Sequence, residues 1–143
     1  MNKESRPVRI FSNNKKARWK DISALGVWGL AIKRSAIDKY HLSFDESFGP
    51  GSICPMGEDS IYLKDLISRS NKVYTNTLLV AYIEQFQSIW FKGYNKDYFV
   101  NLAKATKRLY PHTFHYHVIK NVIYYTLKGH NPFKVWWWMV RRK

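Results

Sequence analysis

A glycine- and proline-rich stretch over residues 44–57, FDESFGPGSICPMG, most constrains how this chain can fold. Four glycines or prolines follow one another closely there before Met56. Proline has no backbone N–H and glycine has no side chain to pack, so a helix or a strand does not run easily through such a stretch. We therefore expect a shaped loop here, with regular structure on either side of it.

The segments that flank this loop predict a mixed fold. Residues 24–35, ALGVWGLAIKRS, form a short apolar run that is typical of a buried strand, with a helix possible over residues 32–39. Apolar residues recur at helical spacing from Glu58 onward and predict a helix of about three turns. Residues 72–83, KVYTNTLLVAYI, are rich in β-branched and aromatic side chains, as in a strand covered on both faces. The order strand, loop, helix, strand predicts an α/β fold class that leans toward α+β.

The last third of the chain is predicted to be helical. A first amphipathic segment ends before Pro111, and a second ends at Gly129. Asn131 resembles an N-cap and Pro132 a first-turn residue of a last short helix. The apolar stripe expected on the second of these helices consists of Val118, Ile119, Val122, Ile123 and Thr126.

These elements suggest three segments along the chain. Residues 1–20 form a basic lead-in, with seven lysines and arginines against Glu4 and few apolar side chains. Residues 21–95 form a core with the loop, its flanking strands and the helix from Glu58. Residues 96–143 form a helical carboxy-terminal region.

The charge of the chain favours anionic partners. Its 24 lysines and arginines against 10 aspartates and glutamates give a net charge of +14. Nucleic acid, an anionic membrane surface and phosphorylated small molecules all fit this charge. The single cysteine, Cys54, excludes an intramolecular disulfide. No apolar run approaches the roughly 18–20 residues of a membrane span, and the start does not look like a signal peptide, so we expect a cytoplasmic protein.

Two adjacent carboxylates, Glu58 and Asp59, stand where the loop gives way to the helix. Acidic residues in a first helical turn interact favourably with the helix dipole, by about 0.3–1 kcal/mol each. This interaction alone can explain the pair, with no catalytic role. The alternative is a catalytic role. The surrounding sequence supports that alternative.

Four stretches carry a resemblance to an enzyme family: WGLAIKRSAI, FDESFGPG, GEDSIYLKDLISRSNKVYTNTLLV and QSIWFKGYNKDYFVNLAKA. In their order and spacing they resemble the acceptor-side, carboxy-terminal half of bacterial family-two glycosyltransferases of the GT-A fold. The resemblance covers about residues 20–110. It implies a partial GT-A-like unit that takes part in inverting sugar transfer from a nucleotide sugar to a lipid-linked or glycan acceptor during cell-surface polysaccharide assembly.

The same resemblance assigns roles to particular residues. Asp59 matches the second residue of the family's Glu-Asp motif, whose aspartate is the base that removes a proton from the acceptor hydroxyl. A positioned carboxylate of this kind contributes typically 10²–10⁴-fold to the rate. Trp28 and Trp90 would stack on sugar rings, although packing in a buried core explains each of them equally well. The implied acceptor-binding residues are Glu58, Asp45, Glu46, Trp28 and Trp90.

The chain departs from the family pattern in its donor site. No Asp-x-Asp triplet occurs in the sequence, so the ligands for the Mg²⁺ or Mn²⁺ ion expected in the complete enzyme are absent from this chain. We expect this chain alone to be inactive or nearly so as a transferase. The strand expected over residues 27–32 would lack sheet neighbours, and its exposed edge predicts homodimerisation. The stretch EQFQSIW replaces the Gln-x-x-Arg-Trp signature of processive members, which favours single-sugar transfer.

The tail suggests a membrane contact. If residues 132–143 are helical, Phe133, Trp136, Trp137 and Val140 share one face, with basic residues at its side and end. Such a pattern suits the headgroup region of an anionic membrane, at the inner face of the cell membrane, and packing of the tryptophans on the domain is the alternative.

Two further possibilities complete the sequence analysis. A non-enzymatic module that binds polyanions or a membrane surface is the main alternative to the transferase, although no specific nucleic-acid motif occurs. The histidines of PHTFHYH, over residues 111–117, do not have the spacing of a familiar metal motif, and we expect no metal site there.

Overall fold

The computed structural model describes residues 11–23, 25–26, 29–70, 72–78 and 91–141. The chain divides into two compact units. Unit 1 consists of Met1–Asp45 and Glu58–Ser88, and unit 2 consists of Glu46–Gly57 and Ile89–Lys143. The glycine- and proline-rich loop therefore belongs mainly to unit 2, while the helix that follows it belongs to unit 1. The segment boundaries predicted at residues 20 and 95 stay predictions.

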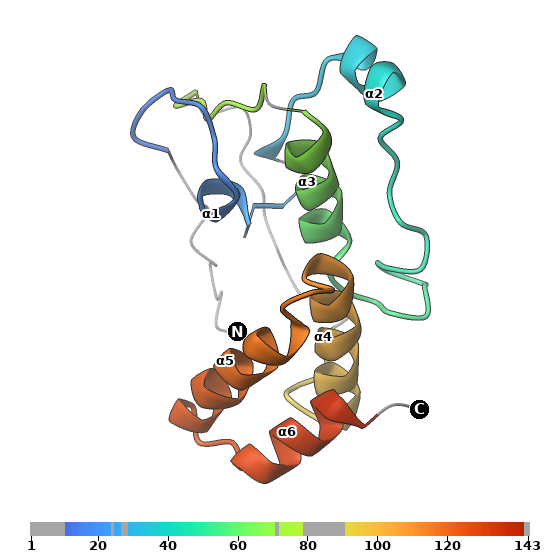
Figure 1. Cartoon of the computed structure of the whole chain (residues 1–143), viewed down its shortest axis with the longest axis vertical. Helices are drawn as coiled ribbons and strands as arrows, with labels where there is room; N and C mark the ends of the chain where they lie inside the picture. The colour runs from blue at the N-terminus through green and yellow to red at the C-terminus, as the bar shows by residue number, and fades with distance from the viewer. Residues whose placement is uncertain (1–10, 24, 27–28, 71, 79–90, 142–143) are drawn as a thin grey trace, which may run out of the picture. The chain divides into compact units, whose positions relative to one another are not determined.

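The prediction of an α/β fold leaning toward α+β, and with it a partial GT-A-like unit, was wrong. The described part of the chain is mostly helical and contains no sheet, only isolated bridges between Lys16 and Tyr74 and between Phe48 and Cys54. Figure 1 labels its six helices. They are α1 (Trp19–Ile22), α2 (Arg34–Tyr40), α3 (Glu58–Arg69), α4 (Lys96–Leu109), α5 (Phe114–Leu127) and α6 (Pro132–Val140).

Side chains explain why the segment predicted as a strand from residue 72 pairs only briefly. The N–H of Ala17 donates to the carbonyl of Val73 at 2.8 Å, which begins an antiparallel pairing. The side chain of Asn14 then accepts the N–H of Thr77 at 3.0 Å, and that of Asn76 accepts the N–H of Leu78 at 2.8 Å. These local hydrogen bonds satisfy backbone groups that a sheet ladder would otherwise use. Residues 79–83 of this prediction lie outside the described part.

Turns replace the other predicted strand. The N–H of Leu25 donates to the carbonyl of Ile22 at 3.0 Å, and the N–H of Gly29 donates to that of Gly26 at 3.0 Å. Glycine favours such turns because its backbone has the widest conformational range. Residues 27 and 28 lie outside the described part. Helix α2 begins at Arg34, so the possible helix over residues 32–39 is confirmed with small shifts at both ends.

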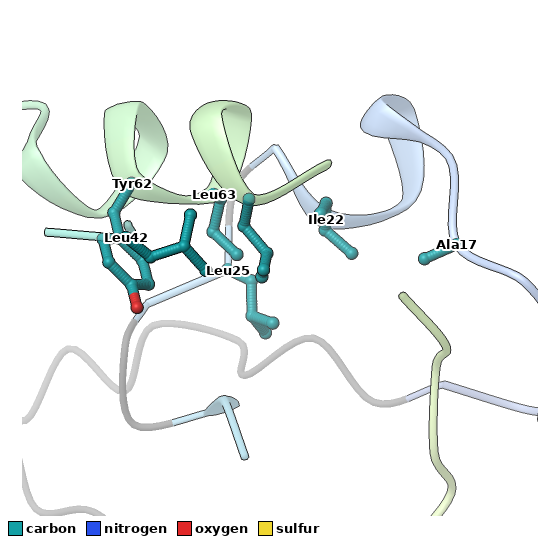
Figure 2. Close-up of a cluster of buried hydrophobic side chains, with 7 residues drawn as sticks. Ala17, Ile22, Leu25, Leu42, Tyr62 and Leu63 are labelled. Carbon is teal, nitrogen blue, oxygen red and sulfur yellow. The ribbon is translucent and has the colours of Figure 1, made fainter. Parts of the chain in front are cut away.

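Unit 1 is held together by apolar side chains that meet along α3. Leu63 is fully buried and Ile22 of α1 nearly so, at 0% and 3% exposure. Burying such side chains stabilises the fold by roughly 1.5–3 kcal/mol each. Figure 2 shows members of this cluster along one side of α3. The complete set of buried residues is Ala17, Ile22, Leu25, Leu42, Tyr62, Leu63 and Leu66.

The lead-in contributes to this core, which the sequence analysis missed. Ala17 is buried, and α1 packs against α3. Asp21 supports the start of α1 because its carboxylate accepts the N–H of Arg18 at 2.9 Å. Part of the segment predicted as a basic lead-in is therefore folded into unit 1.

Unit 2 is built from α4, α5 and α6, each of which packs against the other two. The side chain of Asn95 accepts the N–H of Tyr98 at 3.0 Å and caps α4. Asn131 caps α6 in the same way through the N–H of Lys134, at 3.0 Å, which confirms the sequence prediction. The buried core consists of Phe99, Ala103, Val118, Tyr125, Val135 and Met139.

The glycine- and proline-rich stretch forms the shaped loop that was predicted. Gly49 and Gly51 adopt positive φ values of 106° and 84°, which favour glycine. The N–H of Gly49 donates to the carbonyl of Cys54 at 2.8 Å and closes the loop. Within unit 2, the buried thiol of Cys54 lies 3.5 Å from the carbonyl oxygen of Asn101 in α4.

Candidate functional site

The predicted catalytic pair lies in the first turn of α3, where both Glu58 and Asp59 are partly exposed. Burial of Ile61, Tyr62 and Leu63 fixes the rotation of the helix about its axis. The hydroxyl of Ser60 also donates to the carbonyl of Ser23, at 3.3 Å. Because the inward face of α3 is held in this way, the two carboxylates occupy defined positions at its start.

The two carboxylates of the pair lie in different electrostatic environments. Burial raises the pKa of Glu58 above its ordinary value of 4.5, and the neighbouring charge of Asp59 raises it further. The backbone N–H of Glu58 opposes this shift in part. Partial burial thus makes Glu58 hold its proton more strongly than an exposed glutamate does.

Asp45 and Glu46 fall on opposite sides of the division between the units. Asp45 is partly exposed and belongs to unit 1 with Asp59, whereas Glu46 is exposed and belongs to unit 2. A shared acceptor pocket formed by both residues stays a prediction.

An aromatic side chain that the sequence analysis passed over lies beside this region. The ring of Phe44 stacks on that of Tyr62 at 4.3 Å, with 14° between the ring planes. Tyr62 is one helical turn beyond Glu58, and side chains four residues apart share a helix face. Phe44 is still 48% exposed, so it offers an apolar surface near the start of α3. Its position next to Asp45 in the quoted stretch FDESFGPG was the available sequence signal.

Trp28 and Trp90, the tryptophans assigned to the acceptor, lie outside the described residues. Their stacking role therefore stays a prediction. Homodimerisation also stays a prediction, but the sheet edge expected to mediate it does not occur in the described part of the chain.

The described part of the chain shows neither a cluster of metal ligands nor a helix that could span a membrane. Among these residues, no group of three or more histidine, cysteine, aspartate or glutamate side chains is placed to hold a metal ion. The Mg²⁺ or Mn²⁺ ion expected for the complete enzyme stays a prediction. None of the helices found there has both the length and the apolar character needed to cross a bilayer.

Two shallow hollows lie in unit 2. One, of about 300 Å³, is lined by Phe133, Lys134 and the three tryptophans 136–138 of α6. The other, of about 520 Å³, is lined by Lys104, Lys107, Arg108 and Pro111 at the end of α4. The first is almost entirely apolar and the second is basic.

No protein-family model, curated protein or solved structure matches this chain. The resemblance to family-two glycosyltransferases therefore depends on the sequence motifs alone.

Proposed function

We propose that this chain supplies the acceptor side and the catalytic base of an inverting glycosyltransferase that acts in cell-surface polysaccharide assembly. The observation that carries the proposal is the position of Asp59. It is partly exposed at the start of a helix whose inward face is fixed by Ile61 and Leu63. Its sequence context, GEDSIYLKDL, is the part of the chain that most resembles the family's Glu-Asp motif.

In the proposed reaction, Asp59 takes the proton of the acceptor hydroxyl as the new bond forms between the acceptor oxygen and the sugar. The bond between the sugar and the nucleotide diphosphate breaks on the opposite side, and the diphosphate leaves with the electron pair. Attack opposite the leaving group inverts the anomeric carbon. The carboxylate lowers the barrier because a neutral alcohol is a poor nucleophile.

The residues around Asp59 would support this step. Glu58 lies beside Asp59 in the first turn of α3, and burial and the charge of Asp59 both raise its pKa. The helix dipole of α3 also favours the ionised form of a first-turn carboxylate. The exposed ring of Phe44 offers a flat apolar surface for a sugar ring.

The test joins a donor-binding half of a family-two glycosyltransferase to the amino terminus of the full chain. Transfer of radiolabelled sugar is measured from a panel of nucleotide sugars to bacterial lipid and glycan extracts. Asp59→Asn is expected to lower the rate by about 10²–10⁴-fold. The matched control is Asp65→Asn, because Asp65 is an aspartate on the same helix and forms an ion pair with Arg69 at 3.9 Å.

Equal activity of the Asp59→Asn and Asp65→Asn fusions would show that Asp59 is not the base. Absence of any sugar transfer by the unmodified fusion would contradict the transferase assignment itself. The competing hypothesis, a non-enzymatic basic module, predicts that absence together with binding to anionic polymers or membranes.

A further inference from the structure

Helix α5 is apolar on two opposite faces. Val118 and Tyr125 point into the core of unit 2, with exposures of 1% and 6%. Ile119 and Ile123, predicted to share the buried stripe with Val118, are instead exposed, which corrects that prediction. The large apolar and aromatic residues that α5 exposes are Tyr116, Ile119, Ile123, Tyr124 and Leu127. Large apolar side chains on a helix are normally covered, and no described part of the chain covers this face.

Helix α6 also has one buried apolar face and one exposed apolar face. Val135 and Met139 are buried, and Trp138 stacks on Phe99 with 5.7 Å between the ring centroids. Phe133 on the opposite face is 81% exposed, and Trp136 and Trp137 are about half exposed. The tail tryptophans therefore divide between the two alternatives of the sequence analysis, since one packs on the domain and two face outward.

Cations lie over the aromatic rings of these exposed faces. The guanidinium of Arg141 is 5.0 Å from the ring centre of Trp137. The ammonium of Lys128 is 4.5 Å from the ring of Tyr124, and that of Lys120 is 5.6 Å from the ring of Tyr116. Each basic group thus borders apolar surface, with its charge available to an anion.

The sequence of this region is entirely free of acidic residues. From residue 98 to residue 143 there is no aspartate or glutamate. The same stretch contains nine basic residues: Lys104, Lys107, Arg108, Lys120, Lys128, Lys134, Arg141, Arg142 and Lys143. An apolar surface within so basic a region fits a partner that combines apolar and anionic groups.

Other partners fit this combination less well. A second copy of the chain would bring two strongly basic regions together, and like charges oppose that association. Nucleic acid would use the basic groups and the rings, but the aliphatic side chains of Ile119, Ile123 and Leu127 contribute nothing to stacking. An anionic lipid surface can contact all three kinds of side chain, namely the basic, the aromatic and the aliphatic ones.

We propose that the outer faces of α5 and α6 dock unit 2 onto the surface of an anionic lipid bilayer. Trp136 and Trp137 lie at the headgroup level, where amphipathic rings are favoured. Phe133 and the aliphatic side chains of α5 enter the boundary of the acyl chains. Lys120, Lys128 and Arg141 bind lipid phosphates. The helices lie on the surface, because α6 with its 9 residues spans only about 14 Å, roughly half of a bilayer core.

The test measures co-sedimentation of the full chain with two kinds of vesicle. One contains phosphatidylcholine alone, and the other contains phosphatidylcholine and phosphatidylglycerol in a ratio of about 3:1. We expect binding to the anionic vesicles to be at least about tenfold tighter, and to weaken as salt is raised from about 0.1 to 0.5 M.

Two double variants remove the proposed contacts. Phe133→Ser with Trp137→Ser on α6, and Ile119→Ser with Leu127→Ser on α5, are each expected to weaken binding by about tenfold or more. The matched control is Ile53→Ser, because Ile53 is 82% exposed on the loop of unit 2. It is expected to leave binding unchanged. Circular dichroism checks that each variant keeps its helical content.

A pair of charge variants tests the electrostatic contribution. Lys120→Gln with Arg141→Gln is expected to weaken binding to anionic vesicles by about tenfold or more, since both removed charges lie over aromatic rings of the docking faces. Lys104→Gln with Lys107→Gln removes the same charge from α4, whose exposed side chains are all charged, and is expected to have a smaller effect.

Several results would overturn the proposal. Equal binding to both kinds of vesicle would exclude recognition of anionic lipid. Unchanged binding by both apolar double variants, with their helical content intact, would place any lipid contact elsewhere. Binding to RNA that is tighter than to anionic vesicles at the same salt, and lost in the same variants, would assign these faces to nucleic acid. A wild-type dimer that the apolar variants dissociate would assign them to self-association.

Discussion

The helices of the two units differ in the kinds of residue that they expose to solvent. In unit 1 the exposed residues of α1, α2 and α3 are all polar: Lys20, Arg34, Ser35, Asp38, Lys39, Ser68 and Arg69. In unit 2, α4 follows the same rule, but α5 and α6 expose isoleucine, leucine, phenylalanine, tyrosine and tryptophan. Because the cores of both units already contain buried apolar faces, the exposed apolar residues of unit 2 are not needed for its internal packing.

This difference separates two proposed roles within one chain. Unit 1 carries the adjacent carboxylates Glu58 and Asp59, on a helix whose position is fixed by buried neighbours. The outer faces of α5 and α6 in unit 2 form a basic and apolar surface, in a stretch of sequence without acidic residues. The first arrangement suits proton transfer to a defined atom, and the second suits adhesion to a surface.

The largest effect on stability is expected from the inner face of unit 2. Phe99 has 0% exposure and contacts Tyr98, Tyr125 and Trp138, so Phe99→Ala is expected to destabilise unit 2 by about 3–5 kcal/mol. Ile123→Ala on the outer face is expected to change stability by less than about 0.5 kcal/mol. Urea unfolding followed by circular dichroism measures both. Similar losses of unfolding free energy in the two variants would contradict the distinction between a buried inner face and an exposed outer face.

The core of unit 1 gives the next largest effect. Leu63 has 0% exposure beside the base-bearing start of α3, and Leu63→Ala is expected to cost about 2–5 kcal/mol. Hydrogen exchange should then show faster exchange in α3. The comparison with Leu78→Ala, at a position 72% exposed in the same unit, should show little change. Slow exchange in α3 of the Leu63 variant would mean that this cluster does not hold the helix.

Helix caps in unit 2 are expected to contribute less. Asn95→Ala removes the acceptor of the Tyr98 N–H, and Asn131→Ala removes that of the Lys134 N–H. Each change is expected to destabilise the unit by about 1 kcal/mol. Thermal unfolding is the readout, and Asn121→Ala in the middle of α5 is a control that removes no cap. A variant of Asn131 that melts like the control would show that the start of α6 depends on packing alone.

The smallest effect concerns the pH dependence of unit 1. The folded pKa of Glu58 is raised above 4.5, so the folded state binds this proton more strongly than the unfolded state. The contribution of Glu58 to stability is fully present below pH 4.5 and is lost as the pH rises through the folded pKa. As the pH rises over that range, the free energy of unfolding of the Glu58→Gln variant should therefore increase relative to that of the wild type. A constant difference would mean that Glu58 is not desolvated.

The helical elements of the fold followed from local sequence signals. The start at Glu58, the Asn131 cap and the stop at Gly129 all depend on groups close together in the chain, and the structure confirms them. The strands depended on distant pairing. Asn14 and Asn76 end the pairing at residues 77 and 78 through side-chain hydrogen bonds that composition does not reveal.

Only part of the burial pattern of α5 could be predicted from the sequence, again because it depends on contacts with distant segments. Val118 and Ile119 are adjacent apolar residues, and only the packing of α4 and α6 decides which of them faces inward. For the candidate site, the sequence indicated the Glu58–Asp59 pair and its place in the helix. It gave no sign of the stacking between Phe44 and Tyr62, which joins residues on different segments.

Spin-label accessibility tests the contrast between the two units most directly. A nitroxide is attached at Leu127→Cys on α5, or at Tyr74→Cys in unit 1, both at exposed positions of a chain whose natural Cys54 is buried. On adding phosphatidylglycerol-containing vesicles, the label at 127 should gain contact with dissolved oxygen and lose contact with a water-soluble nickel complex, while the label at 74 stays unchanged. Equal changes at both positions, or none at 127, would contradict the account.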